Sequence, residues 1–117
     1  MDNSSLIFEI ALGLSAPWYV KNISFEENDL KRELHIHLDF EKGFKFKQDD
    51  GSENSGYDSV ERRWQHLNFF EHKCFIHARV PRVKDKSGKV QLQQVPWARK
   101  GSGFTLLFEA FTMLRTS

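Results

Sequence analysis

Strict alternation in residues 33–40 constrains the fold more than any other feature of the chain. Four apolar residues, Leu34, Ile36, Leu38 and Phe40, alternate there with four polar ones, Glu33, His35, His37 and Asp39. Successive side chains of a β-strand point to opposite faces, so this run fits an extended strand and no helix. The pattern predicts a strand with one buried and one polar face, paired with a neighbouring strand.

Similar patterns elsewhere extend this strand to a sheet. Three hairpins are predicted, pairing residues 18–26 with 33–40, 62–70 with 73–80, and 81–84 with 90–95. Turn formers separate the strands: Asn28 and Asp29 in the first hairpin, Glu71-His72 in the second and Ser87-Gly88 in the third. In the second hairpin, Cys74 falls on the apolar face, where it is expected to be a buried small hydrophobe.

A helix is predicted at each end of the chain. Leu6, Ile10 and Leu14 lie four residues apart ahead of Pro17, which bounds a short N-terminal helix. Apolar residues recur at helical spacing over residues 104–115, which predicts an amphipathic helix with Ser102 as its cap. This helix is expected to complete the core or to join a homodimer. The fold class is therefore α+β: antiparallel hairpins in a small sheet, a short N-terminal helix and an amphipathic C-terminal helix.

Length and composition predict one folded domain spanning residues 1–117. Large apolar side chains are abundant, with 11 Phe and 3 Trp, enough to offset chain entropy. Residues 43–57 are rich in turn formers and are expected to be an exposed loop. The single cysteine excludes an internal disulfide and a cysteine-based zinc site, and a reducing cytoplasm is the expected setting. No stretch is long and apolar enough for a membrane span or a leader, so no membrane partner is expected.

Charge is divided unequally along the chain. Residues 1–60 carry 12 acidic and 6 basic side chains, whereas residues 61–117 carry 4 acidic and 11 basic ones. The net charge of +1 therefore hides an acidic first half and a basic second half. Such asymmetry is consistent with an anionic partner or with neutralisation across the fold.

Neither a metal site nor a catalytic site is predicted. His35 and His37 share one strand face, but no spacing fixes a third ligand such as His66 or His77. Cys74 lacks the exposed, electropositive surroundings of a reactive thiolate, and no nucleophile, base and orienting group can be assembled by spacing. No phosphate-binding glycine loop is present. The chain is expected to be a non-enzyme without a cofactor.

Basic residues interleaved with rings in the second half are the candidate nucleic-acid-binding set. They are Arg62, Arg63, Trp64, His66, Arg79, Arg82, Lys84, Lys86, Lys89, Arg99 and Lys100. Cationic side chains bind phosphates, and rings stack on bases or fill grooves. The same charges would also protect exposed sheet edges, so the pattern by itself leaves both interpretations open.

Several blocks resemble a known family when they are considered together. They are YDSVERRWQHLNFF at 57–70, HARVPRV at 77–83, VPWAR at 95–99 and GSGFT at 101–105, with ALGL at 11–14, PWYV at 17–20 and HIHLDF at 35–40. In order and spacing they resemble the N-terminal zinc-finger region of insertion-sequence transposases of the ISL-three type. The resemblance implies a compact module that helps to recognise the ends of a mobile element. In full-length members, a helix-turn-helix and a catalytic domain follow this module.

The cysteines of the family are replaced in this chain. Residues 47–50 and 85–88 stand where the resemblance places the zinc knuckles, and a further cysteine position falls near Asn54. A degenerate zinc finger without a catalytic domain is expected, a domesticated fragment in which aromatic packing replaces the stabilisation supplied by zinc.

Two functions follow from this resemblance. One is DNA binding through the basic second half. The alternative is a protein-binding inhibitor, encoded on a mobile element, that blocks a nucleic-acid-handling complex such as a CRISPR effector. That inhibitor would use the acidic residues Glu26, Glu27, Asp29, Asp39, Glu41, Asp49, Asp50 and Glu53.

Overall fold

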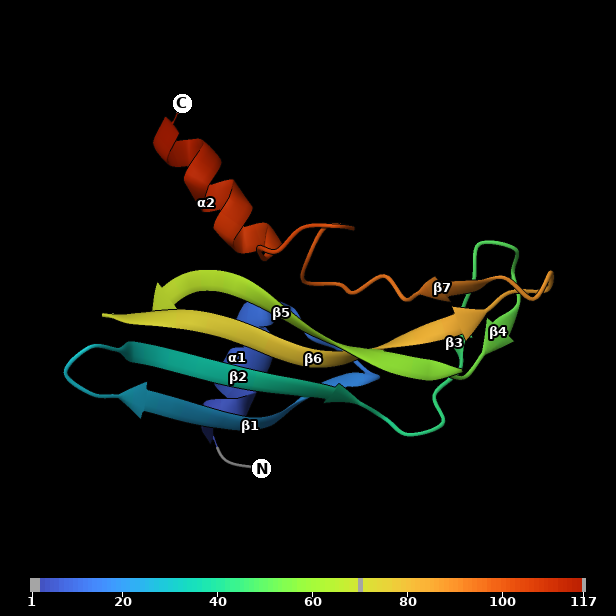
Figure 1. Cartoon of the computed structure of the whole chain (residues 1–117), viewed down its shortest axis with the longest axis horizontal. Coiled ribbons are helices and arrows are strands. Elements are labelled where there is room, and N and C mark those ends of the chain that lie inside the picture. The colour runs from blue at the N-terminus through green and yellow to red at the C-terminus, as the bar shows by residue number, and fades with distance from the viewer. Residues whose placement is uncertain (1–2, 70, 117) are drawn as a thin grey trace.

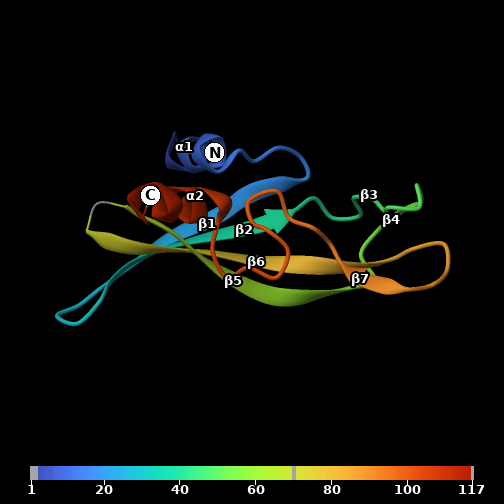
Figure 2. The same cartoon turned by 90° about the horizontal axis from the view of Figure 1, so that it is seen from above.

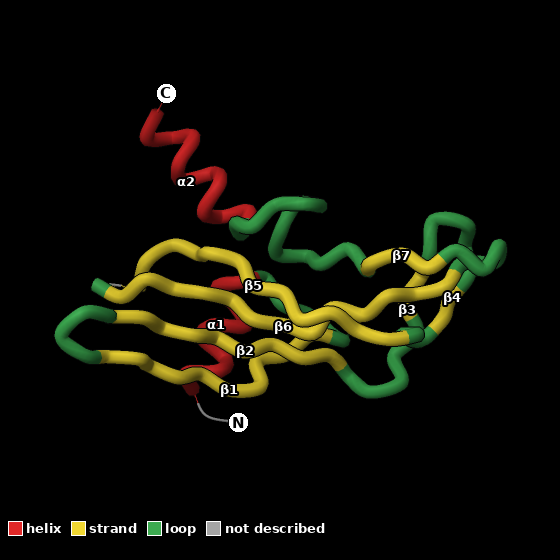
Figure 3. The backbone as a smooth tube through the Cα atoms, viewed as in Figure 1, coloured by secondary structure: helices red, strands yellow, loops and turns green. Residues whose placement is uncertain are grey.

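The computed structural model describes residues 3–69 and 71–116. Its elements in chain order are α1 (Asn3–Leu12), β1 (Trp18–Glu27), β2 (Arg32–Phe40), β3 (Phe46–Lys47), β4 (Glu53–Asn54), β5 (Asp58–Phe69), β6 (His72–Lys84), β7 (Val90–Leu92) and α2 (Leu106–Thr116). A mostly β chain with a helix at each end confirms the α+β class (Figures 1 and 3). Neither helix, within the part of the chain described, is long and apolar enough to cross a membrane.

The main sheet has the strand order β1-β2-β6-β5, with β7 paired to the far half of β6 (Figure 1). All three predicted hairpins are present as β1–β2, β5–β6 and β6–β7, each antiparallel. The sequence did not predict the pairing between the hairpins, in which β2 and β6 run parallel. The register aligns Leu34 with Cys74 and Ile36 with Ile76, so the most apolar strand of each hairpin lies at the centre. Alternation determines which face of a strand is buried, but it does not determine strand neighbours.

One face of the sheet carries the hydrophobic core. α1 and the segment 93–105 cover this face, whereas α2 extends past the β5 edge of the sheet with most of its large apolar side chains exposed (Figures 1 and 2). Three tryptophans meet there edge to face: the ring centroid of Trp97 lies 4.8 Å from that of Trp18 and 5.3 Å from that of Trp64. Such T-shaped pairs add about 0.5–1.5 kcal/mol beyond the area they bury. The tryptophans therefore fix segment 93–105 against the sheet.

The opposite face, which we call the open face, is not covered by any described helix (Figure 2). Its central residues are His35, His37, Phe75 and His77, which alternate with buried residues along β2 and β6. The register places His35 opposite Phe75 and His37 opposite His77. The ring pairs of both positions stack, with centroids 5.5 Å and 4.7 Å apart. The predicted polar face of residues 33–40 is thus half-buried by ring stacking.

The structure differs from the sequence expectation in segment 43–57. Most of these residues are exposed, as expected for a loop, but β3 and β4 pair within the segment as a two-stranded sheet. Phe46 is buried, and its ring contacts those of Trp18, Phe40 and Phe44. A single aromatic residue therefore anchors a segment that is otherwise rich in turn formers.

The helix ends also differ from those expected. α1 ends at Leu12 because Gly13 adopts a φ of 67°, and the N–H of Leu14 donates to the carbonyl of Glu9 at 2.8 Å. α2 begins at Leu106, and its cap is Thr105, whose Oγ1 accepts a hydrogen bond from the N–H of Phe108 at 3.3 Å. The prediction of Ser102 as the cap was wrong, because its hydroxyl accepts from the N–H of Phe104 in the preceding turn.

Candidate nucleic-acid interface

A crevice lies between β5 and the segment that follows β7. The chain leaves β7 with the N–H of Gln93 donating to the carbonyl of Pro81 at 2.8 Å, and Trp97 then anchors it in the core. A turn follows at residues 99–102, where Gly101 has a φ of 78° that favours glycine. The chain returns to β5 where the N–H of Thr105 donates to the carbonyl of Gln65 at 3.0 Å. The turn is therefore held above the inner face of β5.

Three of the predicted basic residues line this crevice of about 70 Å³. Arg62 projects from β5, while Arg99 and Lys100 come from the turn. None of the described residues that line the crevice is acidic. Converging cations whose shared crevice has no acidic lining produce a local positive potential that attracts anions, although Glu109 beside the crevice pairs with Arg99. The sequence separates Arg62 from Lys100 by almost 40 positions, and the fold brings them to one place.

Aromatic and acidic neighbours orient two of these cations. The guanidinium carbon of Arg62 lies 5.7 Å from the ring centroid of Trp64, a cation–π contact that supports the side chain from below. Arg99 Nη2 donates to Glu109 Oε2 at 2.6 Å, so the first turn of α2 orients it. That hydrogen bond raises the pKa of Arg99 and lowers the pKa of Glu109. Arg99 stays cationic and ordered, with part of its charge neutralised.

Sequence reasoning missed the polar residues beside these cations. Gln93, Gln94 and Ser102 also line the crevice and offer amide and hydroxyl groups. Their sequence positions between β7 and α2 carry no periodic signal that marks them as part of a site. Their place in the crevice becomes visible only in the structure, where segment 93–105 folds back over β5.

Two members of the predicted set, Trp64 and His66, lie on the inner face of the sheet, although Trp64 also lines the crevice. Trp64 is 3% exposed and packs against Trp97. His66 lies beneath the start of α2, where its Nδ1 is 2.6 Å from Thr105 Oγ1. Burial lowers the pKa of His66, so it favours the neutral form. Both residues alternate with Arg63 along β5 and therefore point inward rather than to the open face.

The other predicted basic residues are spread over two further regions. On the open face, Arg63 lies over the ring of Phe75 at 4.8 Å, and Arg79 pairs with Asp39 at 3.1 Å. The remaining four lie at or beside the end of β6: Arg82, Lys84, Lys86 and Lys89. There, Arg82 forms a bidentate pair with Asp58, and Lys84 lies over the ring of Tyr57 at 4.4 Å. Of the predicted basic residues, the structure brings Arg62, Arg99 and Lys100 together in one crevice, which Trp64 also lines.

The acidic residues proposed for the alternative function lie in three separate places. Glu26 and Glu27 end β1 and Asp29 follows in the turn before β2, whereas Asp49 and Asp50 lie between β3 and β4 and Glu53 begins β4. These two groups are at opposite ends of the longest axis (Figure 1). Asp39 and Glu41 lie at the end of β2. Several are already paired, as in Glu27 with His72 at 2.8 Å and Glu26 with Lys31 at 3.6 Å.

The single cysteine is structural. Cys74 is 1% exposed in the middle of β6, on the face that packs into the core. Burial raises the pKa of its thiol to about 11, so the reactive thiolate is scarce at neutral pH. This placement agrees with the buried position that alternation predicts.

Comparison with known proteins adds one match. A family model described as the zinc-finger of transposase IS204/IS1001/IS1096/IS1165 matches residues 50–84. The match spans β4, β5 and β6, under a third of the 117 residues, and supports a transposase zinc-ribbon region there. No curated protein and no solved structure matches the chain.

The side chains of residues 47–50 and 85–88, where the sequence predicts the counterparts of zinc knuckles, are not those of a cysteine-based zinc site. Their turns do lie together, because Asp50 Oδ2 accepts a hydrogen bond from the N–H of Lys86 at 2.8 Å. However, neither turn contains cysteine or histidine, and both carboxylates are already used by N–H and hydroxyl donors. Asp50 accepts from the hydroxyl and N–H of Ser52, and Asp85 accepts from Ser87 in the same way. Hydrogen bonds therefore join the two turns.

Proposed function

We propose that the chain binds DNA non-enzymatically, with backbone phosphates seated at the crevice formed by Arg62, Arg99 and Lys100. The observation that carries this proposal is the convergence of the three cations in a crevice without a lining carboxylate. Phosphate contacts supply most of the affinity of non-specific nucleic-acid binding. The crevice offers the positive charge and the amide and hydroxyl groups that such contacts use.

The family match supports the same partner. Arg62 lies within residues 50–84, the region similar to a transposase zinc-finger, and a nucleic-acid-associated role is therefore the natural one for this region. Arg99 and Lys100 lie outside the matched region, but segment 93–105 packs on β5 and positions them beside Arg62. The transposase-like region and the turn after β7 thus form one surface.

Arg62→Ala and Lys100→Ala test this proposal. Each phosphate contact on duplex DNA contributes a factor of about 8 in affinity at 0.1 M salt, from a slope of about 0.9 per contact. Each single variant is therefore expected to weaken binding about 8-fold, and the double variant about 60-fold. Fluorescence anisotropy with a labelled DNA duplex measures the change.

Lys21→Ala is the matched control. It removes one positive charge from an exposed side chain on β1, at the sheet edge opposite β5. Its affinity for the duplex is expected to stay within about 2-fold of the wild type, because it retains all three crevice cations. An equal loss in Lys21→Ala and Lys100→Ala would show that overall charge, not the crevice, binds DNA. Failure of the wild type to bind at low salt would remove the proposal.

The domesticated-fragment interpretation and the protein-binding inhibitor stay predictions from the sequence. The acidic residues are divided between the two ends of the molecule, so they do not form one surface through which an inhibitor would bind.

A further inference from the structure

Two glutamates face each other at the end of the first hairpin. Glu26 on β1 and Glu33 on β2 are direct register partners. Like charges placed directly opposite each other in an antiparallel pair are destabilising. A nearby cation relieves this repulsion. Lys31 supplies part of the charge, at 3.6 Å from Glu26 Oε1.

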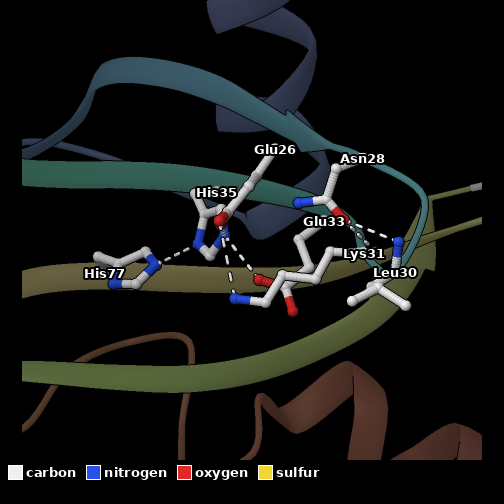
Figure 4. Close-up of polar contacts among 7 residues, drawn as sticks. All are labelled: Glu26, Asn28, Leu30, Lys31, Glu33, His35 and His77. Atoms are coloured by element: carbon white, nitrogen blue, oxygen red, sulfur yellow. Dashed lines mark hydrogen bonds and ion pairs between the residues drawn. The ribbon is translucent and has the colours of Figure 1, made fainter.

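An imidazole completes a three-residue group with these carboxylates. His35 lies two residues beyond Glu33 on β2, so both project from the open face. Its Nε2 is 3.1 Å from Glu33 Oε1 and 3.4 Å from Glu26 Oε2 (Figure 4). The three potential ligand atoms all lie within 4.8 Å of one another.

The two separations from His35 Nε2 are close to those of a tetrahedral metal site. Zinc binds imidazole nitrogen and carboxylate oxygen at about 2.0–2.2 Å, which places neighbouring ligand atoms of a tetrahedron about 3.3–3.6 Å apart. The distances of 3.1 Å and 3.4 Å from His35 Nε2 lie close to that value. Sites with three protein ligands keep a fourth position open to water or another small ligand. The exposure of the Glu26 side chain, 48%, leaves room for access from solvent.

The second ring nitrogen of His35, Nδ1, also has a hydrogen-bonding partner. His35 Nδ1 is 2.7 Å from Nε2 of His77, which comes from the adjacent strand β6 (Figure 4). When Nε2 of His35 binds a metal, its Nδ1 carries the proton and that N–H donates to His77. Metal-binding histidines almost always have such an outer partner, which fixes the ring and its tautomer. The ring of His37 stacks on His77 at 4.7 Å and supports it in turn.

We propose that Glu26, Glu33 and His35 bind a zinc ion at the end of the first hairpin, with His77 as a positioning residue. The site lies outside the matched residues 50–84 and away from the two knuckle turns. It is also independent of the DNA-binding proposal, because it uses none of the crevice residues. Lys31 occupies the same side of Glu26 and competes with the metal for that carboxylate.

Isothermal titration of the untagged, chelator-treated chain with zinc chloride tests the proposal. One zinc per chain is expected, and both Glu33→Gln and His35→Ala are expected to weaken binding at least 10-fold. Glu33→Gln keeps the shape of the side chain, so it remains informative if His35→Ala alters folding. His72→Asn is the control, because among the described residues His72 pairs with one carboxylate, that of Glu27. It is expected to leave affinity unchanged.

Cobalt(II) substitution tests the role of His77. His77→Ala is expected to weaken binding 10- to 100-fold and to change the visible cobalt absorption, whereas His77→Gln, which retains a hydrogen-bond acceptor, is expected to preserve most of both. A merely structural histidine would leave the cobalt spectrum unchanged. The proposal is overturned if the wild type binds no zinc, if Glu33→Gln and His35→Ala bind like the wild type, or if His72→Asn loses as much affinity as His35→Ala.

Discussion

Replacement of Trp97 tests how the molecule holds its crevice in place. Trp97 is 3% exposed, and its ring meets those of Trp18 and Trp64 edge to face. Its indole N–H is buried with no hydrogen-bond partner among the described residues. Packing therefore favours tryptophan at this position, whereas the unpaired donor opposes it. Alanine and phenylalanine separate the two effects.

The two substitutions are expected to lower the free energy of unfolding by different amounts. Trp97→Ala removes the whole ring system and leaves a cavity, which lowers the free energy of unfolding by about 4 kcal/mol. Trp97→Phe loses roughly 2 kcal/mol of buried apolar contact. It also removes the unpaired N–H, whose burial costs about 1–3 kcal/mol. The net change for Trp97→Phe is expected to lie within about 1 kcal/mol of the wild type.

Urea unfolding followed by far-ultraviolet circular dichroism measures both variants. The free energy of unfolding of Trp97→Phe is expected to be close to that of the wild type, and that of Trp97→Ala well below both. The slope of this free energy against urea concentration is expected to be similar for all three proteins. In thermal unfolding the loss for Trp97→Ala corresponds to about 15 °C for a chain of this size. Equal destabilisation by alanine and phenylalanine would refute the reasoning. It would show that the indole N–H contributes to the native structure.

Two further predictions concern the turns and the thiol. Hydrogen bonds from Ser52 and from the N–H of Lys86 lower the pKa of Asp50 from 3.8 to about 2, so its stabilisation is present above pH 4 and is lost as pH falls toward 2. Asp50→Asn is therefore expected to be less stable than the wild type at pH 7, and urea titrations should show the difference closing near pH 2; a constant difference would contradict this. Cys74, buried with a pKa of about 11, is expected to react with a thiol reagent at pH 8 only after unfolding, and rapid reaction of the native chain would contradict its placement.

Local patterns predicted the strands well because burial of one face leaves a direct signature. Alternation in residues 33–40 identified β2, and the same signal placed Cys74 inside. The parallel contact between β2 and β6 leaves no such signature, because neighbours in a sheet are chosen by tertiary packing. The burial of Phe46 could not be predicted either, because a single apolar residue in a polar segment produces no periodic pattern.

Residue type alone was a weaker guide to the site. Arg62 and Trp64 are both in the basic, aromatic stretch and both line the crevice, yet Arg62 brings a cation to it, whereas Trp64 is 3% exposed and forms part of the core. The sequence also gave no reason to join Arg62 with Lys100, since the path of segment 93–105 alone brings them together. Similarly, spacing could not identify the neighbour of His35 on the next strand, whereas the structure places Nε2 of His77 2.7 Å from its Nδ1.

The salt dependence of DNA binding tests the central claim most directly. Three phosphate contacts on duplex DNA give a slope of about −2.7 in a plot of log affinity against log salt, which is about a 40-fold loss between 50 and 200 mM salt. Lys100→Ala is expected to reduce the magnitude of that slope by about 1. A wild-type slope near zero, or an unchanged slope in Lys100→Ala, would contradict phosphate binding at the crevice.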